Sequence, residues 1–204
     1  GDVYKRQEYG TLYSLQELED ISAACRERGL KLFVDGARLA YSLASPANDV
    51  SLADVARLSD VFYIGGTKCG TLFGEAVVIP DGGSIRQFVT QMKQHGALLA
   101  KGRLLGVQFE ALFEDDLYLT LGAPGVAATK RIREALIRAG YVVTMDSPTN
   151  LTFVALDQAG HERLSRKVQY GIWETLPDGR LLARFCTSWG TPEEDIKAFE
   201  AALA

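Results

Sequence analysis

The fold of this chain is decided by the sequence DVFYIGGTKCG at residues 60–70. Its first half is an apolar run of the residue types that favour a strand, and its second half is a glycine-rich loop that contains Lys68. The same order occurs one element earlier, where LKLFV at residues 30–34 leads into DGAR at residues 35–38. Two short apolar strands with a helical segment between them predict a parallel sheet covered by helices on both faces.

Helix signals lie on both sides of these strands. The sequence SLQE at residues 14–17 is a capping box, and apolar residues follow it at helical spacing as far as Gly29. A second helix is predicted to open at Ser51, and residues 75–79 have the pattern of a third strand. Residues 84–140 are mostly helical in pattern, with an amphipathic helix at 126–139 that stops at Gly140.

The pattern changes after Gly140. Strands are predicted at 141–144, 151–156 and 181–186, with a helix at 161–170. The sequence TPEE at residues 191–194 is interpreted as a capping box with proline at the first helical position, opening a last helix. The predicted organisation is an α/β domain over residues 8–115 and a smaller α+β domain over residues 116–204.

Composition excludes several classes of protein. The chain has 204 residues, of which 47% are hydrophobic and 24% charged, and its net charge is −4, which is ordinary for a globular protein. This charge balance argues against nucleic-acid binding, and the apolar runs are too short to span a membrane. Three cysteines without a CxxC motif and only two histidines argue against a metal site. Reduced thiols in a cytoplasmic protein are expected.

The N-terminal sequence stands apart from the rest. Residues 2–7, DVYKRQ, read like the translation of a transposon-end adapter used in shotgun sequencing. We therefore expect residues 1–7 to be a library scar outside the fold, with the natural chain cut just before Glu8. The alternative is a genuine polar N-terminus of a processed protein.

Three side chains could supply chemistry. Asp35 follows the first strand, Lys68 follows the second, and Arg184 interrupts the apolar strand at 181–186. Open α/β sheets bind ligands outside the carboxyl ends of their strands. Pyridoxal phosphate needs a lysine amine for its Schiff base and an acidic partner at its pyridinium nitrogen, and arginine suits an amino-acid carboxylate. Each residue also has a plainer interpretation: Asp35 as a turn former, Lys68 as a solvated lysine, and Arg184 as part of a structural ion pair. Together, the three residues favour this cofactor.

From Glu8 onward the sequence resembles the low-specificity L-threonine aldolases, in the β-eliminating lyase group of fold-type I pyridoxal-phosphate enzymes. The resemblance rests on the stretches EYGTLYSLQELEDIS, LFVDGARLAYSL, DVFYIGGTKCGTLFGEAVVI, QMKQHGALLAKGRLLG and ARFCTSWGTPEEDIKAFEAAL. It implies that residues 8–115 are the C-terminal half of the α/β cofactor-binding large domain, a mostly parallel sheet with helices, and that residues 116–204 are the small α+β domain. It also implies that the phosphate-binding loop and the histidine that stacks on the cofactor lie N-terminal to this segment, so the fragment alone is expected to be inactive.

The resemblance also implies roles for single residues. Lys68 holds the cofactor covalently, and Asp35 pairs with the pyridinium nitrogen. Arg38 and Arg184 hold the substrate carboxylate. Arg38 also belongs to the implied cofactor-binding set.

Two further roles are implied. Thr67 contacts the cofactor phosphate, and Lys93 matches a family lysine near the active site that reaches toward a neighbouring subunit. The implied activity is pyridoxal-phosphate-dependent cleavage of L-threonine or L-allo-threonine to glycine and acetaldehyde, by a cytoplasmic homo-oligomer, dimer or tetramer. Two alternatives stay open: another fold-type I enzyme, such as a transaminase or a β-eliminating lyase, and a non-catalytic domain that retains the fold.

Overall fold

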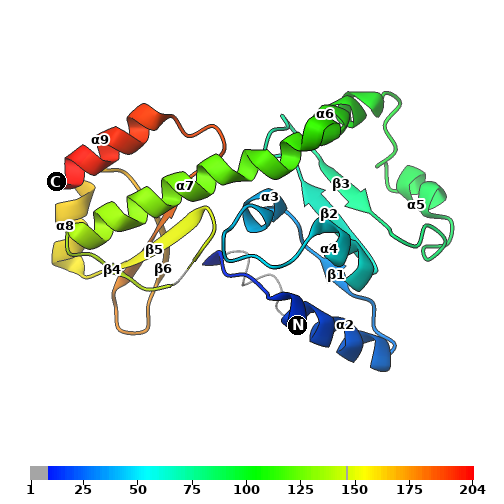
Figure 1. Cartoon of the computed structure of the whole chain (residues 1–204), viewed down its shortest axis with the longest axis horizontal. Helices are drawn as coiled ribbons and strands as arrows, with labels where there is room; N and C mark the ends of the chain where they lie inside the picture. The colour runs from blue at the N-terminus through cyan, green and yellow to red at the C-terminus, as the bar shows by residue number, and fades with distance from the viewer. Residues whose placement is uncertain (1–8, 146) are drawn as a thin grey trace.

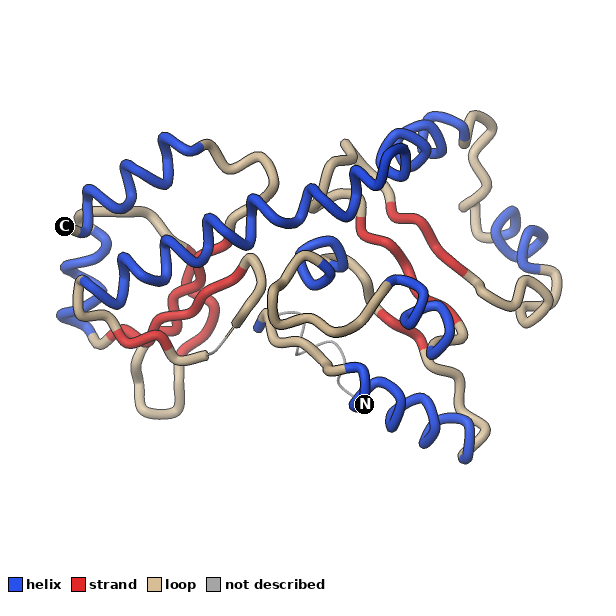
Figure 2. The backbone as a smooth tube through the Cα atoms, viewed as in Figure 1, coloured by secondary structure: helices blue, strands red, loops and turns tan. Residues whose placement is uncertain are grey.

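The structure, a computed structural model, describes residues 9–145 and 147–204 (Figure 1). It contains a three-stranded sheet with the order β1-β2-β3 and a four-stranded sheet with the order β4-β5-β7-β6 (Figure 2). The long helix α7 (Leu117–Arg138) runs past both sheets, with α3 (Leu39–Leu43) packed on one end and α9 (Glu193–Leu203) on the other (Figure 1). The predicted adapter-derived segment, residues 1–7, lies outside the described residues.

The first sheet is mixed. β1 (Phe33–Val34) pairs in parallel with β2 (Val61–Gly65), which confirms the predicted parallel pairing. β1 is shorter than the predicted run, because the chain before it is held by a side chain: the Asp60 carboxylate accepts a hydrogen bond from the Leu32 amide at 2.8 Å. β3 (Glu75–Val78) runs antiparallel to β2, since the loop at 66–74 is too short for the crossover that a parallel strand needs.

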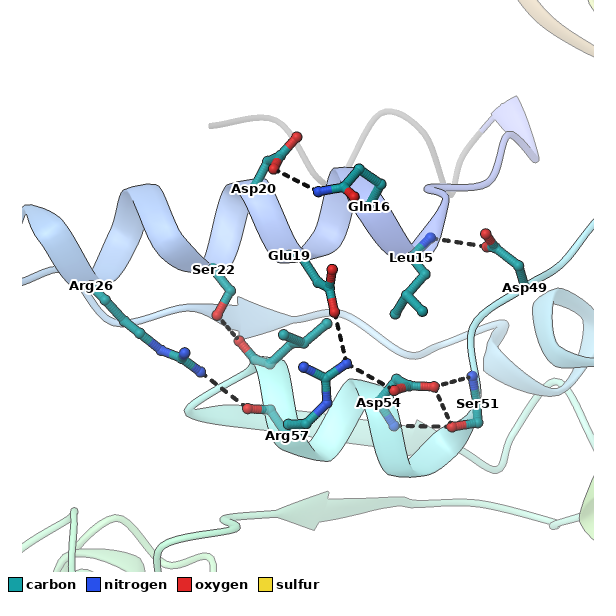
Figure 3. Close-up of polar contacts among 11 residues, drawn as sticks. Leu15, Gln16, Glu19, Asp20, Ser22, Arg26, Asp49, Ser51, Asp54 and Arg57 are labelled. Atoms are coloured by element: carbon teal, nitrogen blue, oxygen red, sulfur yellow. Dashed lines mark hydrogen bonds and ion pairs between the residues drawn. The ribbon is translucent and has the colours of Figure 1, made fainter.

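Helices α2 (Leu15–Glu27) and α4 (Leu52–Leu58) pack side by side (Figure 3). Both begin with a capping box, at Ser14 and Ser51, so the predicted helix starts are confirmed. Between the helices, the buried Ser22 hydroxyl donates to the carbonyl of Leu58 at 2.7 Å. This bond satisfies a buried hydroxyl and fixes the spacing of the two helices.

Residues 84–140 are mostly helical, as the pattern predicts. α5 (Phe88–Gln94) and α6 (Arg103–Phe113) are followed by a 3₁₀ turn at Glu114–Asp116 and then by α7. The domain boundary predicted between 115 and 116 falls on this turn, while the helix predicted at 126–139 is the C-terminal part of α7. In the part of the chain that the structure describes, no helix is long and apolar enough to cross a membrane.

The second sheet consists of β4 (Val142–Val143), β5 (Leu151–Leu156), β6 (Gly171–Thr175) and β7 (Leu181–Cys186), all antiparallel. One face packs on α7, α8 (Gln158–Ser165) and α9 through Val154, Leu156, Ala183 and Phe185. The opposite face carries Leu151, Phe153 and Leu182, which pack with Tyr9 and Trp173. Because side chains alternate along a strand, Arg184 and Cys186 lie on the same face as Leu182.

Two predictions for this region are wrong in detail. The helix predicted at 161–170 spans Gln158–Ser165, because the Asp157 carboxylate caps it by accepting from the Gly160 amide at 2.6 Å. The predicted capping box at 191–194 does not form: α9 begins after Pro192 without a side-chain cap. The Thr191 hydroxyl instead accepts from the Ser188 amide at 2.8 Å.

The contact between α7 and α3 gives a direct test of this fold. A Cβ added at Gly122 would lie 2.2 Å from the carbonyl oxygen of Ala40, so Gly122→Ala is expected to lower the free energy of unfolding by about 1–3 kcal/mol. Gly106, in α6, has nothing within 4 Å of such a Cβ, so Gly106→Ala should raise stability by about 0.5–1 kcal/mol through helix propensity. Urea denaturation measures both, and equal effects would contradict the packing of α7 on α3.

Candidate active site

The loops that follow β1 and β2 meet through their backbones. The Gly65 amide donates to the carbonyl of Gly36 at 2.9 Å. A Cβ added at Gly36 would lie 1.7 Å from the carbonyl oxygen of Tyr63, and one at Gly65 would lie 2.4 Å from that of Ala37. Only glycine permits so close an approach. Asp35 and Lys68 therefore lie on adjoining loops at one edge of the sheet.

Asp35 is half-buried directly after β1. Its Oδ1 accepts hydrogen bonds from the Ala37 amide, at 3.0 Å, and from the hydroxyl of Tyr63 on β2. These two donors fix the orientation of the carboxylate at the strand end. Asp35 also lines a cavity of about 100 Å³ beside α2 and α3, together with Leu18 and Leu39.

Lys68 is exposed within a tight turn. The turn is closed by the Cys69 amide, which donates to the carbonyl of Gly66 at 2.8 Å, and Gly70 adopts a left-handed φ of 101°. Within residues 9–145 and 147–204, the Lys68 ammonium makes neither a hydrogen bond nor an ion pair, so it is accessible to a ligand. Burial raises the pKa of the Cys69 thiol to about 11, so this neighbour is a neutral packing group.

Thr67 has a different partner from the one that the resemblance implies. Its hydroxyl donates to Oε1 of Glu75 at 2.6 Å, and the Gly66 amide donates to Oε2 of the same carboxylate at 2.7 Å. Glu75 therefore anchors the start of the lysine loop to β3. A phosphate group beside Thr67 would meet this negative charge, so contact between Thr67 and phosphate stays a prediction that requires Glu75 to release the hydroxyl.

Arg38 and Arg184 come from different parts of the chain to the same region. Arg38 precedes α3, and its guanidinium lies 3.8 Å from Sγ of Cys186, at the end of β7. Arg184 lies two residues before Cys186 on the same face of the strand. Its guanidinium stacks on Trp173, 4.2 Å from the ring centroid, and has no carboxylate partner in the described part of the chain. Arg38 thus reaches the strand that carries Arg184, and the binding of one anion by both guanidinium groups stays a prediction.

The structure does not bring Lys93 to these residues. Lys93 is exposed on α5, which lies at the opposite end of the molecule from the four-stranded sheet (Figure 1). Its implied role toward a neighbouring subunit stays a prediction.

Sequence reasoning missed three side chains of this region. Tyr63 could have been found from the strand register, because it follows Phe62, which pairs with Val34, and so lies beside Asp35. Glu75 and Trp173 gave no such signal, since each acts through a contact made only after the sheets form.

The donor set favours one kind of ligand. An accessible amine can condense with an aldehyde, and an oriented carboxylate can hold a proton on a ring nitrogen. Two guanidinium groups can bind a carboxylate. The residues present therefore fit pyridoxal phosphate together with an amino acid.

The chain is similar to several known proteins. A family model described as beta-eliminating lyase matches residues 6–169. A low specificity L-threonine aldolase of Pseudomonas aeruginosa is 31% identical over 195 residues, which are 93% of this chain and 54% of that protein. A solved structure of Leishmania major threonine aldolase is 45% identical with a TM-score of 0.89, covering 96% of this chain and 57% of that one.

A more distant structure shows the fold alone. Serine palmitoyltransferase of Sphingomonas wittichii is 16% identical with a TM-score of 0.62, over 91% of this chain and 50% of that one. The predicted fold class is confirmed by these structures. The chain spans about half the length of the curated relatives that it matches.

The anchoring of the lysine loop by Glu75 is testable. Glu75→Ala removes a charged acceptor whose hydrogen bonds contribute roughly 1.5–3 kcal/mol, so the Gly66 amide should exchange with deuterium about 10- to 100-fold faster. Glu110→Ala, an exposed change on α6, is the control and should leave this exchange rate unchanged. Unaltered Gly66 exchange in Glu75→Ala would mean that Glu75 does not hold the loop.

Proposed function

This chain belongs to the β-eliminating lyase family, and we propose that it forms part of a pyridoxal-phosphate-dependent L-threonine aldolase. Such an enzyme would cleave L-threonine or L-allo-threonine to glycine and acetaldehyde. The observation that carries the proposal is the position of Asp35 and Lys68 on adjoining glycine loops at one sheet edge. The names of the similar Pseudomonas and Leishmania proteins support the same reaction.

Lys68 and Asp35 are the residues that would hold the cofactor. The exposed Lys68 amine would bind its aldehyde carbon, and the Asp35 carboxylate, oriented by Tyr63 and the Ala37 amide, would hold the proton on its ring nitrogen. When bound, pyridoxal phosphate supplies an electron sink for the electron pair that the broken Cα–Cβ bond leaves at Cα.

Arg38 and Arg184 would hold the substrate. Their guanidinium groups would bind the amino-acid carboxylate, Arg38 from the start of α3 and Arg184 from β7. A carboxylate fixed by two cations restricts rotation at Cα and so selects which of the Cα bonds is cleaved. The stacked Trp173 ring orients the guanidinium of Arg184 for this contact.

We also propose that the complete protein is a cytoplasmic homo-oligomer. All three cysteines are free, as in a reducing compartment. Exposed large apolar side chains concentrate around α5 and α6, and Lys93 lies among them. They are Leu72, Phe73, Val89, Leu98, Leu99, Leu104 and Val107. Apolar surface of this kind supports an interface between subunits.

The aldolase proposal predicts defined products. Expressed over its complete reading frame and supplied with pyridoxal phosphate, the protein should release glycine and acetaldehyde in equal amounts from L-threonine. Lys68→Ala should lower the rate by a factor of about 10³ or more, because the amine is lost. The control is Lys31→Ala. The Lys31 ammonium lies 2.8 Å from the Asp60 carboxylate and is not part of the lysine loop, so this variant should keep full activity. Formation of a keto acid in place of acetaldehyde would identify a transaminase instead.

The arginine assignment has its own test. Arg184→Lys should raise KM for L-threonine by about 10- to 100-fold, because lysine cannot reproduce the bidentate fork. The matched control is Arg180→Lys, which changes an exposed arginine paired with Asp178 and should leave KM unaltered. Equal KM values for the two variants would remove Arg184 from the substrate site.

A further inference from the structure

Tyr41 connects the lysine loop to the segment that follows β7. Its side chain lies on α3 and is fully buried. The phenol oxygen donates to the carbonyl of Lys68 at 2.5 Å and accepts from the amide of Trp189 at 3.3 Å. This one hydroxyl therefore donates to one backbone segment and accepts from another, and the two segments are far apart in the sequence.

The ring of Tyr41 is fixed from a third direction by α7. A Cβ added at Gly125 would lie 2.8 Å from Cε1 of the ring and 3.2 Å from the carbonyl carbon of Ser188. The absence of a side chain at Gly125 thus allows the ring and the Ser188 backbone to close on the helix. The hydroxyl cannot move away from Lys68 unless α7 or the Ser188–Trp189 segment moves too.

The hydroxyl remains a donor at all physiological pH values. Burial raises the pKa of Tyr41 to about 12, although the hydrogen bond from the Trp189 amide acts in the opposite direction. The neighbouring Cys69 thiol is neutral as well, so it brings no charge to this contact.

Hydrogen bonds hold the lysine loop from two sides. Its own turn uses the carbonyl of Gly66, which accepts from the amides of Cys69, at 2.8 Å, and Thr71, at 3.1 Å. The carbonyl of Lys68 points out of that turn and is held by Tyr41. The peptide between Lys68 and Cys69 is thus held at its N–H by Gly66 and at its carbonyl by Tyr41.

We propose that Tyr41 is a positioning residue. It fixes the Lys68 peptide relative to the backbone at Trp189, which follows β7, the strand that carries Arg184. This inference rests on the proposed function, because it concerns how the amine of Lys68 and the guanidinium of Arg184 keep one relative position. Tyr41 reaches neither the cofactor nor the substrate in this role, and acts through the Lys68 carbonyl and the Trp189 amide.

The test is Tyr41→Phe, which keeps the ring and removes both hydrogen bonds. Amide exchange in the complete protein should become about 3- to 10-fold faster at Trp189 and at Cys69 together. The rate at which borohydride traps pyridoxal phosphate on Lys68 should fall about 10-fold, because the amine is less well positioned. Gly125→Ala keeps the hydroxyl but displaces the ring, and it should produce the same two changes.

Tyr118→Phe is the matched control. Tyr118 is another buried tyrosine, and its hydroxyl accepts from the Ala40 amide of α3 at 3.1 Å. This variant should lose stability but leave the exchange at Trp189 and Cys69, and the trapping rate, at wild-type values. If Tyr41→Phe behaves like Tyr118→Phe, or speeds exchange at only one of the two amides, the proposal is overturned. Failure of the wild-type protein to trap cofactor on Lys68 would refute the proposed function, and the exchange measurement would still decide the coupling by itself.

Discussion

The backbone contact between Gly36 and Gly65 is the constraint on which the site depends. Parallel pairing of β1 and β2 brings two strand ends to one edge, but side chains at these positions would hold the following loops apart. With glycine at both, the turn that carries Asp35 lies directly against the loop that carries Lys68. A carboxylate and an amine from separate strands are thereby placed at one edge without any direct bond between them.

The short helix α3 extends this arrangement to the second sheet. Its first turn follows Arg38, which contacts Cys186 on β7, and its buried Tyr41 bonds the backbones of Lys68 and Trp189. Helix α7 supports α3 from behind through small residues such as Gly125. The relative position of the two sheets is thus determined by a few close contacts, which suits a site whose cationic and nucleophilic groups come from opposite sides.

Local patterns predicted the described strands except β6, the capped helices α2 and α4, and the loops of Asp35 and Lys68, because those features depend on neighbours in the sequence. The antiparallel direction of β3 was also implicit in the length of the loop before it. The partner of Thr67 was not predictable, because the carboxylate of Glu75 reaches it only after β2 and β3 pair. Tyr41 resembled an ordinary core residue for the same reason, since both of its hydrogen-bond partners lie in distant segments.

The central claim is that Asp35 and Lys68 serve one ligand. It is tested most directly by a crystal structure of the protein, expressed over its complete reading frame, with pyridoxal phosphate bound. We expect continuous electron density from Nζ of Lys68 to the cofactor, with the carboxylate of Asp35 within hydrogen-bonding distance of the ring nitrogen. Cofactor density at another lysine, or Asp35 and Lys68 directed to opposite faces of the sheet, would contradict the account.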